Sequence, residues 1–130
     1  MIVKKHKKQR PKNLDLFTIR LPVNAVVSIM HRASGVALFL IQPFLLWALY
    51  LSLSSPAGYA RVAGQLQAWP VKLLVTALAW AFFHHFYAGI RHLAMDVHWM
   101  TTLQKARFSS RVVLGLVAFT MLWVLWAIWG

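Results

Sequence analysis

The sequence has 130 residues, 60% of them hydrophobic and 12% charged, and its 14 Lys and Arg against two acidic residues give a formal net charge of +12. Soluble domains contain about 25% charged residues, so this composition indicates a membrane protein, and the length allows one domain at most. The absence of cysteine excludes disulfides, thiolate metal sites and cysteine nucleophiles.

The positive charge is concentrated at the N-terminal end of the chain. Seven of the cations lie in residues 1–20, and the others are scattered around apolar runs. No basic motif with interleaved aromatic residues is present, so we do not expect nucleic acid as a partner. We interpret residues 1–23 as a basic cytoplasmic arm followed by a short interfacial segment that lies on membrane lipid.

The first transmembrane helix is predicted over residues 24–53, because its uncharged run exceeds the about 20 residues that a helix needs to cross a bilayer. Ser28, His31, Arg32 and Gly35 lie near its start at helical spacing and share one face. Arg32 could simply reach the lipid head groups and anchor the helix end. Because that role does not explain a hydroxyl and an imidazole on the same face, we favour a polar site for a quinone or for cofactor carboxylates.

The second transmembrane helix is predicted over residues 70–96 and carries histidines within its apolar run. Histidine is costly to bury in a membrane and therefore indicates a function. On a helix, His85, Gly89, His92 and Asp96 fall on one face, one turn after another. A second stripe beside this face holds His84 and Arg91.

A third transmembrane helix is predicted over residues 112–130, and residues 54–69 are interpreted as a loop because they contain Pro and Gly. The N-terminal arm and the second connection are basic, whereas residues 54–69 carry one cation. The positive-inside rule then puts the N-terminus in the cytoplasm and the C-terminus outside. The expected fold is an all-α integral membrane domain, residues 24–130, with both polar stripes at the cytoplasmic membrane level.

Haem ligation and quinone binding are the chemistries that these residues can support. No hydrolytic or phosphate-binding constellation is present, so we predict no catalytic residue in this chain. Imidazole is a common axial haem ligand, and Gly89, one turn from His85, would let a porphyrin approach the helix. His84 has a small residue, Ala88, at the matching position, so spacing favours His85 without excluding His84. A histidine that only hydrogen-bonds a neighbouring helix is a third alternative.

A six-coordinate haem needs a second axial ligand. Within this chain only His31 could supply it, and we favour a ligand from a partner subunit instead, because three helices with two exposed polar stripes look like half of an assembly.

Two stretches of the sequence resemble a known family. The run from Gln9 to Gly35 contains Arg-Pro and then Ser-x-x-His-Arg-x-Ser-Gly, and the run from His85 to Asp96 has the pattern His-x3-Gly-x-Arg-His-x3-Asp. With the three-span layout, these motifs resemble the larger cytochrome b membrane-anchor subunit of succinate dehydrogenase, respiratory complex II, of the proteobacterial type. The resemblance covers essentially the whole chain, although residues 54–69 and the third span match mainly by layout.

The resemblance implies that His85 is an axial ligand of a haem b shared with a smaller anchor subunit, and that Ser28 and Arg32 line a ubiquinone site. Residues that it implies near the haem propionates or the quinone pocket are His31, Arg32, Arg91 and His92. His84 has no equivalent in the motif and is expected to be structural, as is Asp96.

The resemblance also implies partners and a location. Iron–sulfur and flavoprotein subunits would oxidise succinate, and this chain would attach them to the bacterial inner membrane. Two alternatives stay open: a fumarate reductase anchor that uses menaquinone, and a haem-free structural anchor whose histidines only pair helices.

Overall fold

The computed structural model describes residues 18–130 and is helical apart from short connections. Its helices are α1 (Val23–Ser54), α2 (Pro56–Leu66), α3 (Trp69–Asp96) and α4 (Leu103–Trp129). The expected basic arm and most of the interfacial segment, residues 1–17, lie outside the described residues.

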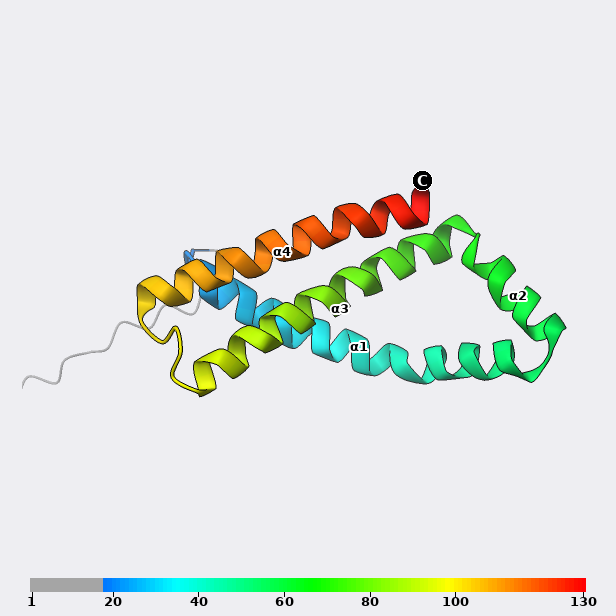
Figure 1. Cartoon of the computed structure of the whole chain (residues 1–130), viewed down its shortest axis with the longest axis horizontal. Helices are drawn as coiled ribbons and strands as arrows, with labels where there is room; N and C mark the ends of the chain where they lie inside the picture. The colour runs from blue at the N-terminus through cyan, green and yellow to red at the C-terminus, as the bar shows by residue number, and fades with distance from the viewer. Residues whose placement is uncertain (1–17) are drawn as a thin grey trace, which may run out of the picture.

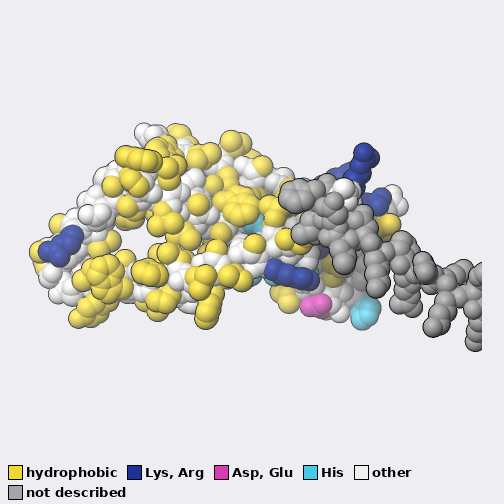
Figure 2. Space-filling view, turned by 180° about the vertical axis from the view of Figure 1, so that it is seen from behind, with side chains coloured by type: hydrophobic (Ala, Val, Ile, Leu, Met, Phe, Trp, Pro, Cys, Tyr) yellow, Lys and Arg dark blue, Asp and Glu magenta, His cyan; other side chains and the backbone are white. Residues whose placement is uncertain are grey.

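Three of the helices, α1, α3 and α4, are long and apolar enough to cross a membrane. They contain 32, 28 and 27 residues, more than the about 20 that a bilayer requires. Apolar side chains cover most of the surface, and Lys and Arg lie toward its two ends (Figure 2). The prediction of an all-α membrane fold with three spanning helices is thereby confirmed.

The prediction of a loop over residues 54–69 was wrong, because residues 56–66 form helix α2. Ser55 caps this helix by accepting a hydrogen bond from the Gly58 N–H at 3.0 Å, and Pro56 occupies a first-turn position that needs no N–H donor. A Cβ on Gly58 would collide with the carbonyl oxygen of Leu51 in α1. Gly58 therefore permits α1 and α2 to meet closely at a corner.

The third spanning helix begins earlier than predicted, at Leu103 and not at residue 112. The predicted span covers only the uncharged part, because Lys105, Arg107 and Arg111 interrupt the apolar run. Lys and Arg are good helix formers, so these residues end the apolar run without ending the helix.

The helices form an open arrangement in which α3 is central. α3 contacts α4 along its length and also contacts α1, and Figure 1 shows α1 and α3 crossing and then diverging toward α2. α2 bridges the diverging ends, and an opening lined by apolar side chains is visible there in Figure 2. The second half of α1 is therefore exposed, and the polar side chains gather at the other end.

Alanine, serine and valine make up most of the interior where the helices cross, beside the buried side chains of His84 and Arg91. Val27 of α1, Ala88 of α3, and Val113 and Val117 of α4 make up the buried cluster. Small side chains allow close approach between membrane helices, for which lipid supplies no hydrophobic driving force. This close packing sets the spacing of α1 and α3 at the level of the histidines.

Candidate functional site

Three imidazoles form a stacked histidine column (His31, His85 and His92) between α1 and α3. The ring of His31 lies against that of His85, with centroids 4.2 Å apart and planes inclined by 12°. His31 also stacks on His92, at 4.8 Å and 30°. His85 and His92 are two helical turns apart on one face of α3, as the sequence predicted, and α1 adds the third ring.

Two glycines make room for the histidine column. A Cβ on Gly89 would lie 3.7 Å from Nε2 of His31, which is ordinary contact. A Cβ on Gly35 would lie only 2.9 Å from Cε1 of His85. Gly35, from the neighbouring helix, is therefore the residue that fits against His85, whereas Gly89 accommodates His31.

Hydrogen bonds fix the tautomer of His85. Its Nδ1 lies 3.1 Å from the carbonyl oxygen of His31, and a carbonyl can only accept, so Nδ1 carries the proton. The Ser34 hydroxyl donates to the same carbonyl at 2.9 Å and lies 3.4 Å from Nδ1. Nε2 of His85 therefore keeps its lone pair, and no described residue hydrogen-bonds to it.

His84 has the opposite surroundings, because it is fully buried inside the chain. Its Nε2 lies 3.4 Å from the carbonyl oxygen of Val27, and its ring stacks on Trp80 with centroids 5.4 Å apart. Nδ1 is buried and has no partner among the described residues. This position leaves no room for a macrocycle, so His84 holds α3 against α1.

Ser28 and Arg32 lie one helical turn apart on α1, on either side of His31 in the sequence. Ser28 is half-buried and Arg32 is exposed. Within residues 18–130, the Arg32 guanidinium makes no hydrogen bond or ion pair, so all its donors remain available. The structure thus brings a hydroxyl and a free cation beside the histidine column.

Arg91 is not part of this group. Its side chain is 7% exposed and points to α4, where Nε donates to Ser109 Oγ at 3.1 Å and Nη2 donates to the Ala106 carbonyl at 3.4 Å. Asp96 is exposed at the end of α3 and forms no ion pair in the described part of the chain. Of the sequence-predicted residues, His31, His85 and His92 are in contact, whereas Arg91 faces another helix.

The donor set fits a porphyrin iron better than a bare metal ion. No group of three or more His or Asp side chains in residues 18–130 is arranged to hold a metal. A haem iron takes its equatorial ligands from the porphyrin and needs only an axial imidazole from each side. An imidazole whose Nδ1–H is held by a carbonyl, with Nε2 unpaired, is the usual form of such a ligand.

Sequence reasoning did not assign a role to Ser34, although it lies within the motif that carried the resemblance. Its side chain is 2% exposed and reaches the hydrogen bonds around His85. The sequence indicated only a small polar residue three positions after His31. Ser34 reaches His85 because α1 crosses α3 at this level.

Comparison with known proteins gives one family. The chain matches the succinate dehydrogenase/fumarate reductase transmembrane subunit family over residues 6–124. It is 36% identical over 107 residues to a succinate dehydrogenase cytochrome b556 subunit of Coxiella burnetii, covering 81% of this chain and 85% of that protein. A cytochrome b556 subunit of Paracoccus denitrificans is 31% identical, with 82% of each chain covered. A cytochrome b560 subunit of Reclinomonas americana is 30% identical over 92% of this chain and 85% of its own.

Proposed function

Because the chain belongs to the succinate dehydrogenase/fumarate reductase transmembrane subunit family, we propose that it is the larger cytochrome b membrane anchor of a succinate:ubiquinone oxidoreductase. Flavoprotein and iron–sulfur subunits oxidise succinate in the proposed complex. This chain and a smaller anchor subunit attach them to the bacterial inner membrane. The N-terminus lies in the cytoplasm and the C-terminus outside, as the loop charges favour.

His85 is the proposed axial ligand of a haem b, which supplies a one-electron redox centre when bound. The observation that carries this assignment is the Nδ1 contact to the His31 carbonyl at 3.1 Å, which leaves the lone pair of Nε2 for iron. The second ligand comes from the smaller anchor subunit. His31 would not suit that role, because its ring is already stacked on that of His85.

His31, His92 and Arg32 are the proposed contacts of the haem propionates. They are donors at the same membrane level as His85, and Arg32 has no competing partner in the described part of the chain. A guanidinium matches a carboxylate with two parallel hydrogen bonds. We do not extend this role to Arg91, since its donors are directed to Ser109 and Ala106.

Ser28 and Arg32 are the proposed contacts of ubiquinone, which takes up two electrons and two protons when it is reduced. The Ser28 hydroxyl donates a hydrogen bond to one quinone oxygen. The Arg32 guanidinium stabilises the negative charge that develops on the ring as electrons arrive. This chain holds the substrate and carries no catalytic residue for succinate oxidation.

The first test is a reduced-minus-oxidised visible spectrum of the chain purified with the subunits that accompany it. We expect a low-spin b-type band that is lost in His85→Ala and kept in His84→Phe, which fills the same buried space. A band that survives His85→Ala and disappears in His84→Phe would reverse the assignment. If the intact complex shows no such band, the chain is a haem-free structural anchor.

The fumarate reductase alternative is less well supported by the comparisons. The family description includes both enzymes, whereas the relatives from Coxiella, Paracoccus and Reclinomonas are all named succinate dehydrogenase subunits. Quinone type in the host membrane distinguishes the two, because the alternative uses menaquinone.

A further inference from the structure

Ser34 of α1 places a buried hydroxyl beside the ring of His85. Its side chain is 2% exposed, and its Oγ lies 3.4 Å from Nδ1 of His85. The hydroxyl donates to the carbonyl oxygen of His31 at 2.9 Å, a contact that serine often makes with the preceding turn of its own helix. The same carbonyl oxygen lies 3.1 Å from Nδ1 of His85. One oxygen of α1 thus accepts both from a serine and from the proposed haem ligand.

The carbonyl oxygen of His31 faces more donors than it has lone pairs. Helix α1 is continuous from Val23 to Ser54, so the helical pattern directs the N–H of Gly35 to this oxygen as well. A carbonyl oxygen has two lone pairs, and three donors therefore compete for them. The bonds from Ser34 and His85 are slightly longer than the usual values of about 2.7–2.8 Å for O–H···O and about 2.9–3.0 Å for N–H···O. These lengths fit an oxygen that is shared.

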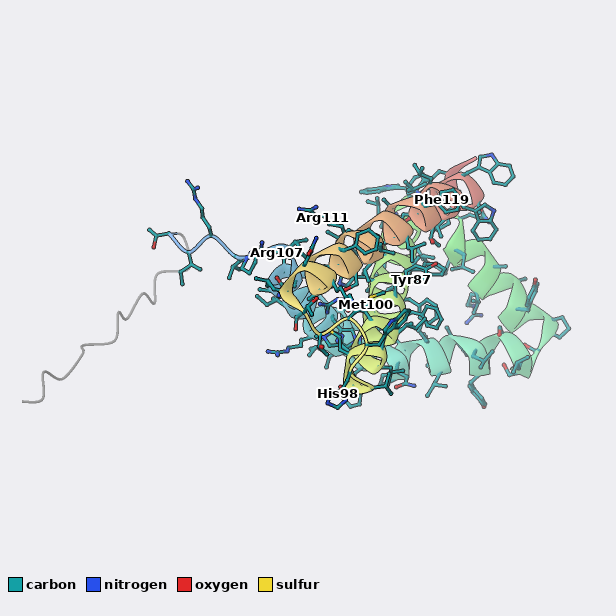
Figure 3. All side chains as sticks on the ribbon, turned by 60° about the vertical axis from the view of Figure 1, so that its left-hand side comes forward. Tyr87, His98, Met100, Arg107, Arg111 and Phe119 are labelled. Atoms are coloured by element: carbon teal, nitrogen blue, oxygen red, sulfur yellow. The ribbon has the colours of Figure 1, made fainter. Side chains whose placement is uncertain are left out.

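The polar surroundings of His85 come from α1 and not from α4. Tyr87 is two residues from His85, about 200° around α3. Its hydroxyl lies 2.9 Å from Oγ1 of Thr120 on α4, and Figure 3 shows Tyr87 close to that helix. Helix α4 therefore lies behind the ligand, whereas α1 lies in front of it. In the described part of the chain, the groups at hydrogen-bond distance from His85 both belong to α1.

The hydrogen bond at Nδ1 determines how strongly Nε2 of His85 donates electrons to a metal. A strong acceptor draws the Nδ1 proton away from the ring and raises the basicity of the ligand. A more basic axial ligand favours ferric over ferrous iron, because ferric iron carries the higher positive charge. By donating to the His31 carbonyl, Ser34 makes that oxygen a weaker acceptor for Nδ1. The ring of His85 is thereby kept closer to neutral imidazole.

We propose that Ser34 is a positioning residue that raises the reduction potential of the haem held by His85, because it shares the His31 carbonyl with Nδ1. This inference rests on the proposed ligand role of His85. Ser34 acts on the iron through the ligand and the carbonyl that holds it. The neighbouring Gly35 determines where the imidazole stands, whereas Ser34 determines how easily the haem takes up an electron.

The experiment is a redox titration of the b-type band in the purified complex. Ser34→Ala removes the hydroxyl and keeps a small side chain, so the low-spin band should remain. The ratio of ferrous to ferric haem at a fixed potential should fall by about threefold, as expected when one bond to a shared acceptor is lost. Ser34→Thr keeps the hydroxyl and should keep the wild-type ratio.

Ser110→Ala is the matched control on α4. It removes a fully buried hydroxyl that donates to the Ala106 carbonyl of its own helix at 2.8 Å. This change should leave the ratio of ferrous to ferric haem as it is in the wild type. An equal fall in Ser34→Ala and Ser110→Ala would show a general loosening of the helices and would overturn the proposal.

The sign of the change in Ser34→Ala is decisive. An unchanged ratio overturns the proposal, and so does a higher one, which would make Oγ itself the acceptor of the Nδ1 proton. If Ser34→Ala binds no haem, a wild-type band and ratio in Ser34→Thr support the role of the hydroxyl. Loss of haem in both variants, or equal ratios in them, assigns Ser34 to packing alone and overturns the proposal.

His85→Ala separates this inference from the proposed function. If the band survives in His85→Ala, the ligand assignment fails and the role of Ser34 fails with it. If the band is lost in His85→Ala while Ser34→Ala keeps the wild-type ratio, the ligand assignment stands and only the role of Ser34 is wrong.

Discussion

The imidazole of His31 lies flat against that of His85, and the backbone carbonyl of His31 also holds Nδ1 of the same ring. One residue of α1 therefore fixes both the tilt and the tautomer of a histidine on α3. The angle at which α1 crosses α3 thus determines the direction of Nε2.

Gly35→Ala is expected to disturb the haem without unfolding the protein. Its Cβ would stand 2.9 Å from Cε1 of His85, so the imidazole must tilt or the helices must separate. We expect a shifted and weaker b-type band in the reduced spectrum.

Gly115→Ala is the control, because a Cβ there has no neighbour within 4 Å. This change should leave the band unaltered and stabilise α4 by about 0.5–1 kcal/mol. Equal spectra for the two variants would show that the contact of Gly35 with His85 does not orient the ligand.

Arg32→Ala is expected to lower ubiquinone reduction by about a hundredfold, since the loss of one donor aimed at developing charge has effects of this size. Succinate oxidation with a soluble artificial acceptor should continue at the wild-type rate. Arg32→Lys keeps the charge and loses the planar pair of donors. Its rate of ubiquinone reduction should therefore lie between the rates of the wild type and of Arg32→Ala. A parallel loss of both activities in Arg32→Ala would remove the quinone role.

Ser109→Ala is expected to loosen the contact between α3 and α4. The Nε of buried Arg91 would lose its partner at 3.1 Å, at a cost of about 1–3 kcal/mol in the free energy of unfolding. The thermal unfolding midpoint of the purified complex should fall while the haem spectrum stays the same. A spectral change at constant stability would instead place Arg91 close to the haem.

His98→Asn is expected to stabilise the connection between α3 and α4. His98 has a φ of 61°, and the left-handed region costs an ordinary side chain about 1–2 kcal/mol. The short polar side chain of Asn can hydrogen-bond locally in this region, so the unfolding midpoint should rise with no effect on the haem band. An unchanged or lower midpoint would mean that contacts of the histidine ring outweigh its backbone strain.

The sequence predicted the spanning helices and the shared face of the α3 histidines, because apolar length and helical spacing are properties of a single segment. It could not predict the partner of Gly89, since the ring that faces this glycine belongs to His31 on another helix. The choice between His84 and His85 was open on spacing alone. Their burial separates them, and burial depends on the position of α1 and α4.

The prediction of a loop in place of helix α2 failed for a different reason. Ser55 followed by Pro56 is a recognised helix start, but Gly58 and Gly64 in so short a segment favoured a loop. The reason for Gly58 is the carbonyl of Leu51 in α1, a contact that no pattern within the segment could indicate.

The corner made by Gly58 and Leu51 has a consequence for biosynthesis. These residues are close in the chain, so their contact can form while α3 is still being synthesised, and contacts between near neighbours form fastest. The direction in which the chain turns back toward the bilayer is then set before the histidines of α3 enter it. A bulky side chain at Gly58 should therefore act during membrane insertion, as a lower yield of inserted protein, and should affect the chemistry of the assembled complex much less.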